Sequence, residues 1–179
     1  MILLDGKSLS EKNLSDLKQK IENSRLKINL DIVLVGDNPS SLKYIALKQK
    51  QALRVGIGGQ LYHLPDTISQ NLILELFDKL NKNTKTTGYF IQLPIPNIPN
   101  NKVLLNNIST HKDADGLNPN SGVTPAVVKG IITLLNNYQI SFHQKNIVIV
   151  NDSDLIGKPL QKIFNQYSNS VFLLNRAIK

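Results

Sequence analysis

The chain has 179 residues, 41% of them hydrophobic, no cysteine and a net charge of +8, which is enough length for one large domain or for one domain and part of a second. Zero cysteines exclude disulfides, thiolate metal sites and cysteine nucleophiles, and His63, His111 and His143 lack the spacing of a metal-binding pair, so we expect no metal. No apolar run is long enough to cross a bilayer, and the chain does not open with a basic segment and a longer apolar stretch, so we expect a cytoplasmic protein without a membrane partner.

The first elements follow from hydrophobic periodicity. Residues 8–27 have apolar side chains at mixed three- and four-residue steps, as an amphipathic helix does. Residues 30–35 form an apolar, β-branched run that ends at Gly36. A run of this kind is typical of a strand buried on both faces of a parallel sheet.

The next helices and strands are bounded by capping signals. Asn38 is the expected cap of a helix whose first residue is Pro39 and which ends near Gly56. We predict a further helix over residues 69–82 and a second buried strand over residues 88–93. The resulting order is α-β-α-(β)-α-β.

The pattern restarts after residue 123. Thr124 followed by Pro125 predicts an N-cap and a first helical residue, for a helix that ends near Tyr138. After it we expect a strand, a helix with Pro159 in its first turn and a second strand, at residues 146–150, 155–167 and 170–174. A β-α-β unit of this kind begins a nucleotide-binding domain.

The predicted fold class is therefore α/β, with two domains. Residues 1–123 are the expected N-terminal α/β catalytic domain, with a mostly parallel sheet. Residues 124–139 are the expected connecting helix. Residues 140–179 are the expected start of a Rossmann-like dinucleotide-binding domain.

Polar side chains share one face of the helix that follows Asn38. Ser41, Tyr44 and Lys48 have spacings that place them on one side, where they can line a cleft. The opposite, sheet-facing side is expected to carry Leu42, Ile45, Ala52 and Leu53. A lysine beside an apolar wall loses its proton more easily than in water and can then transfer protons, but the same spacing also fits a solvated lysine beside a half-buried tyrosine.

Two further polar groups follow predicted strands or turns. Gln92 begins a Gln-Leu-Pro-Ile-Pro run at the carboxyl end of a buried strand, where open α/β sheets bind ligands, although the prolines can also simply end the strand. Asp113 and Asp115 flank an alanine, and Gly116 allows the backbone to approach a flat ligand. Read alone, these two carboxylates are equally typical of a solvated turn.

In this order, the motifs resemble the bifunctional methylenetetrahydrofolate dehydrogenase/methenyltetrahydrofolate cyclohydrolase family, over essentially the whole chain. The matching segments are Leu4-Asp5-Gly6-Lys7, Val35 to Ser41 leading to Tyr44-x-x-x-Lys48, Gly56-Ile57, Leu64-Pro65, the Gln92 run, Lys112 to Pro119, Thr124-Pro125 and Ser153-x-x-Ile156-Gly157-Lys158-Pro159.

The resemblance implies an enzyme that interconverts 5,10-methylene-, 5,10-methenyl- and 10-formyl-tetrahydrofolate for one-carbon metabolism and purine biosynthesis. It implies that Lys48 is the central catalytic group and that Gln92 holds and tunes it. It also implies that Tyr44 stacks on the aminobenzoyl part of the folate and that Asp115 accepts hydrogen bonds from the pterin; Ser41 belongs to the same substrate site. A homodimer is implied as well.

The nucleotide-binding half departs from the family pattern. Ser153 and Gly157 are the implied cofactor-binding residues, and the implied cofactor is NADP, with NAD as the alternative. However, Asn151 and Asp152 stand where the family has Gly-Arg, and the arginine is the residue that pairs with the 2′-phosphate of NADP. Dehydrogenase activity is therefore the less secure expectation, and cyclohydrolase activity, which needs no nicotinamide, is the one expected to survive.

The resemblance also implies that the chain ends well before a typical family member does, so the last strands of its second domain are expected to be absent. A half-built sheet has an unpaired edge and is marginal unless a partner covers it. The alternative to an enzyme is therefore a non-catalytic remnant or folate-binding module that needs a partner chain.

The net charge of +8 allows three interpretations: a nucleic-acid surface, an anionic ligand or a lysine-rich composition without a specific role. The lysines are scattered, and no aromatic ribonucleoprotein motif is present. We therefore expect no nucleic acid, and expect instead that lysines attract the polyglutamate tail of a tetrahydrofolate derivative.

Overall fold

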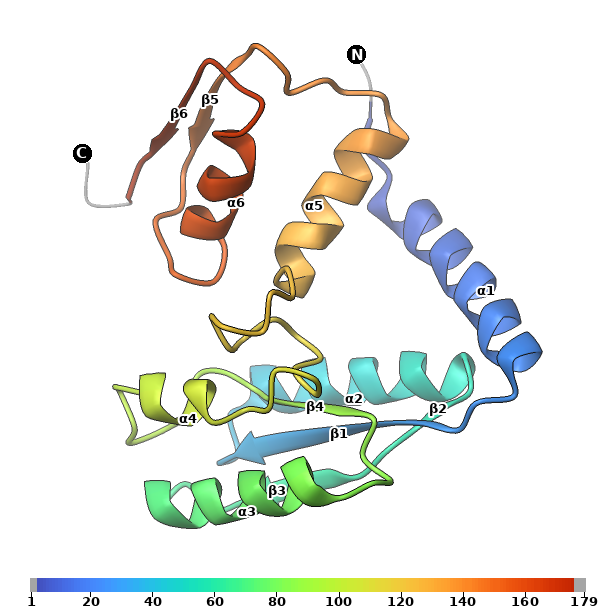
Figure 1. The fold of residues 1–179 in the computed structure, drawn as a ribbon, viewed down its shortest axis with the longest axis vertical. Helices are drawn as coiled ribbons and strands as arrows, with labels where there is room; N and C mark the ends of the chain where they lie inside the picture. Colours follow the sequence, from blue (N-terminus) through green and yellow to red (C-terminus); the bar gives the residue numbers. More distant parts are fainter. Residues whose placement is uncertain (1–2, 176–179) are drawn as a thin grey trace. The chain divides into compact units, whose positions relative to one another are not determined.

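The computed structural model describes residues 3–175, and its contacts divide the chain into two compact units (Figure 1). The first unit is Ser10–Val123, and the second unit is Met1–Leu9 together with Thr124–Lys179. Each unit has α/β architecture with parallel strands, which confirms the predicted fold class.

The first unit is built around one parallel sheet. Strand β1 (Ile28–Val35) pairs with β2 (Ile57–Gly58), β3 (Leu61–Leu64) and β4 (Gly88–Ile91), all in parallel. The last five residues of β1 are buried, as its apolar composition predicts.

A glycine is required where β2 passes into β3. Gly59 has φ +143°, and a Cβ atom there would lie 1.9 Å from the carbonyl oxygen of Leu30. Directly after it, the Gln60 N–H donates to the buried carboxylate of Asp31, which also accepts from the Thr86 hydroxyl at 2.6 Å. The bend between β2 and β3 is therefore stabilised from inside the sheet.

Four helices accompany this sheet: α1 (Gly6–Ser24), α2 (Pro39–Arg54), α3 (Gln70–Lys82) and α4 (Lys102–Asn106). Helices α2 and α3 lie on opposite sides of β1 (Figure 1). Two neighbouring residues of β4 show the same arrangement, because successive strand residues face opposite ways. The Tyr89 ring packs edge-on against Phe77 of α3, and the Phe90 ring lies against Lys48 of α2.

The caps of α2 and α3 are confirmed. The Asn38 side chain accepts from the Ser40 and Ser41 N–H groups, and Pro39 is the first residue of α2. The Ser69 hydroxyl accepts from the Leu72 N–H at the start of α3. Gly56, with φ +85°, follows the end of α2.

Three predictions for the first unit are wrong in detail. The strand predicted over residues 88–93 ends at Ile91, because a cis peptide bond joins Leu93 to Pro94 and the prolines donate no backbone hydrogen bond. Leu42 and Leu53 do not face the sheet: Leu53 is 70% exposed, and Ile45 carries the contact. Helix α4 was not predicted at all.

The second unit contains α5 (Ala126–Asn137), β5 (Asn146–Ile149), α6 (Gly157–Phe164) and β6 (Ser170–Leu173). Strands β5 and β6 pair in parallel, so the predicted β-α-β unit is confirmed. Its buried core consists of Val128, Leu160, Phe164 and Val171. The Asp5 N–H donates to the Tyr138 hydroxyl, which fixes the start of the chain to the end of α5.

Two helix starts in this unit differ from prediction. Pro125 lies at the N-cap position with ψ 137°, so α5 begins at Ala126 and Thr124 is not its cap. Helix α6 begins at Gly157 rather than at residue 155, because Ile156 has the non-helical angles φ −129° and ψ −64°. Pro159 still lies in the first turn, where its missing N–H costs nothing.

Within residues 3–175, no helix is both long and apolar enough to span a bilayer. The same part of the chain contains no group of three or more side chains suited to hold a metal ion.

Candidate functional site

Helix α2 positions three of the predicted site residues. Its N-cap fixes the first turn, in which Ser41 is buried and its N–H bonds to Asn38. Tyr44, one turn later, has 47% of its surface exposed and is therefore available to a ligand. Lys48 follows another turn along the same face.

Lys48 is held between a carboxylate and two aromatic rings. Its ammonium nitrogen lies 3.1 Å from an Oδ atom of Asp115, 3.8 Å from the centroid of the Phe90 ring and 5.0 Å from that of Tyr44. The side chains of Lys48 and Asp115 are only 23% and 24% exposed. The alternative of a solvated lysine is therefore wrong, and the cation is stabilised by a charge and by the faces of the rings.

The two aspartates of the Asp-Ala-Asp segment differ in role. Asp113 is buried, and its two carboxylate oxygens accept the N–H groups of Leu117 and Asn118. Asp115 instead extends to Lys48, which is 67 residues earlier in the chain. The solvated-turn interpretation is wrong for both carboxylates, because one organises the backbone and the other forms part of the site.

Gln92 follows β4 directly, as predicted. Its backbone N–H donates to the Val33 carbonyl, which prolongs the β1–β4 pairing by one bond. Its side-chain N–H donates to the neighbouring Leu93 carbonyl at 2.8 Å. The amide thus lies at the carboxyl end of the sheet, two residues from Phe90, whose ring contacts Lys48.

Two members of this cluster were missed by sequence reasoning. Phe90 reads as an ordinary core residue of a strand, and nothing in its spacing indicates that its ring lies beneath the Lys48 ammonium. Gln51 follows Lys48 by three residues on α2, and its side-chain oxygen is buried without a hydrogen-bond partner. Helical spacing from Lys48 is the signal that could have found Gln51.

The residues predicted to hold the cofactor lie in the loop between β5 and α6. The Asn151 side chain accepts the N–H groups of Ser153 and Gly157, and the Ser153 hydroxyl accepts that of Ile156. A Cβ atom on Gly157 would lie 1.9 Å from the Asn151 carbonyl oxygen, so only glycine lets α6 start this close to the strand end.

This backbone arrangement fits a dinucleotide, because a strand, a tight glycine-containing loop and a helix are what the pyrophosphate approaches in such folds. The charges fit a phosphate less well. Asp152 and Asp154 are exposed in the loop, and the nearby Lys158 ammonium is bonded to Asp154 at 2.6 Å.

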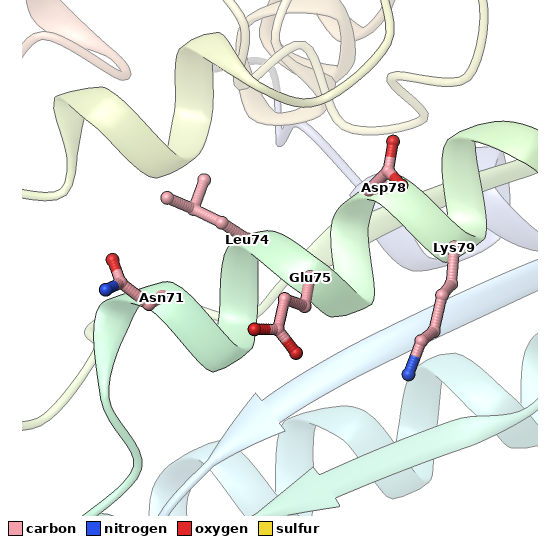
Figure 2. A pocket seen from close by; sticks show the side chains of 5 residues that line it. All are labelled: Asn71, Leu74, Glu75, Asp78 and Lys79. Carbon is pink, nitrogen blue, oxygen red and sulfur yellow. The ribbon is translucent and has the colours of Figure 1, made fainter.

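The best-defined hollow of the first unit does not belong to this cluster. It has a volume of about 530 Å³ and lies along one polar face of α3, lined by Asn71, Leu74, Glu75, Asp78 and Lys79 (Figure 2). Asp78 is already paired with Lys82. All five lining residues come from a single helix, and we assign no function to this surface.

The fold and the Lys48 cluster together define a class: an α/β protein with an amine, a carboxylate and an amide near the carboxyl edge of a parallel sheet, followed by a β-α-β unit of dinucleotide-binding type. Residues 4–115 match the family model described as the tetrahydrofolate dehydrogenase/cyclohydrolase catalytic domain. Residues 125–179 match that of the NAD(P)-binding domain of the same enzymes. The chain belongs to the tetrahydrofolate dehydrogenase/cyclohydrolase family.

Individual relatives agree. The chain is 36% identical to the bifunctional protein FolD of Sulfurihydrogenibium sp. (strain YO3AOP1) over 92% of its own length and 62% of that protein. It is 34% identical to the FolD protein of Aliarcobacter butzleri, covering all of this chain and 67% of the relative. The crystal structure of the bifunctional enzyme FolD from Campylobacter jejuni superposes with a TM-score of 0.92 at 33% identity, over 100% of this chain and 68% of the other. The chain thus spans about two thirds of the length of these relatives.

Proposed function

We propose that this chain acts on tetrahydrofolate derivatives and interconverts their 5,10-methylene, 5,10-methenyl and 10-formyl forms, with hydrolysis of the methenyl form as its main activity. The observation that carries the proposal is the Lys48 cluster, in which one ammonium contacts Asp115, Phe90 and Tyr44. Family membership supports the substrate class.

In the proposed site, Tyr44 stacks on the aminobenzoyl ring and Asp115 accepts hydrogen bonds from the pterin edge. Ser41 supports the same substrate site from the first turn of α2. A carboxylate suits the pterin edge because an aminopyrimidinone offers two adjacent donors. When those donors engage Asp115, Lys48 loses its ion-pair partner. The neutral amine is then favoured, since a nearby anion is what stabilises the ammonium.

Hydrolysis requires that water add to the methenyl carbon. As the new C–O bond forms, the water gives a proton to Lys48, and cleavage of the bond from that carbon to N5 then leaves the formyl group on N10. Gln92 orients the lysine, and the Phe90 ring keeps the ammonium close to the sheet in the resting state. This sequence uses only residues of the first unit.

In the dehydrogenase direction, NADP or NAD would accept a hydride from the methylene carbon, and Ser153 and Gly157 would hold the cofactor. The NAD(P)-binding family model over residues 125–179 supports this assignment. The exposed acids of the β5–α6 loop make it the weaker activity. We also propose a cytoplasmic homodimer, and polyglutamylated substrates drawn by the net charge of +8.

The first test is the hydrolysis of 5,10-methenyltetrahydrofolate, followed by its loss of absorbance without nicotinamide. Lys48→Met should reduce the rate to background while leaving the circular dichroism spectrum unchanged. Lys50→Met on the same helix is the matched control, because Lys50 lies about 200° away around the helix axis and is exposed. Equal rates in wild type and Lys48→Met would refute the proposal. Tight binding without lysine-dependent hydrolysis would instead indicate a non-catalytic folate-binding module.

A further inference from the structure

Gln51 shares the face of α2 that carries the proposed chemistry. It follows Lys48 by three residues and Tyr44 by seven, and both spacings place side chains on one side of a helix. Helical side chains lean toward the N-terminus, so Gln51 lies over the turn that carries Lys48. Gln49 is on the same helix, but its direction differs from that of Gln51 by about 200°.

The side-chain oxygen of Gln51 is fully enclosed and accepts no hydrogen bond. Among residues 3–175 it is the one buried side-chain polar atom in this state, whereas the buried carboxylates of Asp31 and Asp113 each accept two hydrogen bonds. An unpaired buried acceptor lowers the stability of the folded chain, and an apolar side chain of the same length would avoid that loss. A donor supplied by a ligand explains why an amide occupies this position.

We infer that Gln51 binds the pterin ring of tetrahydrofolate and that its oxygen accepts the N8–H of that ring. This inference rests on the proposed function. Along α2 the order is Tyr44, Lys48, Gln51, and a rise of about 1.5 Å per residue separates the first and last by roughly 10 Å. The ligand has the same order of parts: the aminobenzoyl ring, the one-carbon bridge at Lys48, and then the pterin.

The choice of N8–H gives the site a specificity. Tetrahydrofolate and its methylene and methenyl derivatives carry a hydrogen on N8, whereas N8 of fully oxidised folic acid is an acceptor. Two acceptors facing each other in a buried place repel, and a site built around a hydrogen bond rejects an analogue that lacks the donor. The donors that Asp115 would bind are present in both ligands, so Asp115 does not discriminate between them. Gln51 therefore selects reduced folates.

The test is the ratio of the dissociation constants of folic acid and tetrahydrofolate, measured by calorimetry for wild type, Gln51→Met and the control Gln49→Met. Wild type and Gln49→Met should prefer tetrahydrofolate, and Gln51→Met should lose about tenfold of that preference through weaker tetrahydrofolate binding. Without ligand, Gln51→Met should melt about 2–4 °C higher than wild type, because the orphan oxygen is gone.

Two results would overturn the inference. An unchanged ratio in Gln51→Met would show that the oxygen does not contact N8. A lower Tm of the ligand-free variant would show that the oxygen has a protein donor and a structural role. Failure of the proposed function looks different: wild type would then bind neither ligand, or Lys48→Met would leave hydrolysis unchanged while the Gln51 ratio still shifts.

Discussion

At the scale of single residues, burial separates side chains that maintain the fold from those that face a ligand. Asp113 and Asp115 are two positions apart, yet the first is 6% exposed and holds two backbone N–H groups, whereas the second reaches Lys48 with a quarter of its side chain exposed. Their separate contacts predict separate consequences when each is changed.

Asp113→Asn should lower the free energy of unfolding by about 2 kcal/mol, because the amide nitrogen would face a backbone N–H and leave a buried donor unpaired. Asp115→Asn should cost less than about 1 kcal/mol, since the partly exposed ion pair is screened by solvent. In tetrahydrofolate binding the order should reverse, with the Asp115 variant the weaker binder. Urea unfolding and calorimetry measure both quantities, and a stability loss centred on Asp115 would contradict the assignment.

Tyr89 gives a pH-dependent contribution to stability. Burial raises the pKa of its phenol above the ordinary value of 10, because the phenolate cannot be solvated there. The unfolded chain releases this proton near pH 10 and the folded chain retains it. Tyr89 therefore favours unfolding as the pH rises above 10.

Tyr89→Phe should make the decline of the urea midpoint between pH 9 and 11 shallower. At neutral pH the same variant should lose about 1 kcal/mol, since Asn81 loses the hydrogen bond from the phenol. Tyr167→Phe, at an exposed position, serves as the control and should leave the decline as in wild type. An equal effect of both variants would contradict the argument.

At the scale of elements, the sequence predicted what depends on neighbouring residues. The caps Asn38 and Ser69 and the apolar run of β1 are local signals, and those elements were placed correctly. Helix α4 was missed because its five residues lie in an Asn-rich stretch without a capping bond. The Lys48–Asp115 contact joins residues 67 apart, so spacing suggested the two groups but not their contact.

The cap of α2 can be tested without touching the site. Asn38→Ala should reduce the free energy of unfolding by about 1 kcal/mol, because the Ser40 and Ser41 N–H groups lose their acceptor. Ser69→Ala should cost a similar amount at α3. The kcat of methenyltetrahydrofolate hydrolysis should stay the same in both variants below their melting temperatures, since Lys48 lies more than two turns inside α2. A large fall in kcat for Asn38→Ala alone would show that the first turn positions the lysine.

At the scale of the whole molecule, the two units differ in how completely their sheets are covered. The first unit has a sheet with α2 and α3 on opposite sides (Figure 1). In the second unit, the two-stranded sheet buries Val171 against α5 and α6, while Val148, Val150 and Phe172 are more than half exposed. Two paired strands alone have marginal stability, so this unit depends on its single covered face.

This asymmetry predicts opposite outcomes for two adjacent residues of β6. Phe172 is 58% exposed, and Phe172→Ser should change the free energy of unfolding of the 179-residue chain by no more than about 0.5 kcal/mol while reducing self-association. Val171 is 9% exposed, and Val171→Ser should cost about 2 kcal/mol or more, because it opens a cavity and buries a hydroxyl. Urea unfolding combined with limited proteolysis should place the earliest cuts of the Val171 variant within residues 124–175. A large stability loss in Phe172→Ser would instead mean that the open face is covered in solution, most simply by a second copy of the chain, and size-exclusion chromatography of the two variants would then reveal the change in oligomeric state.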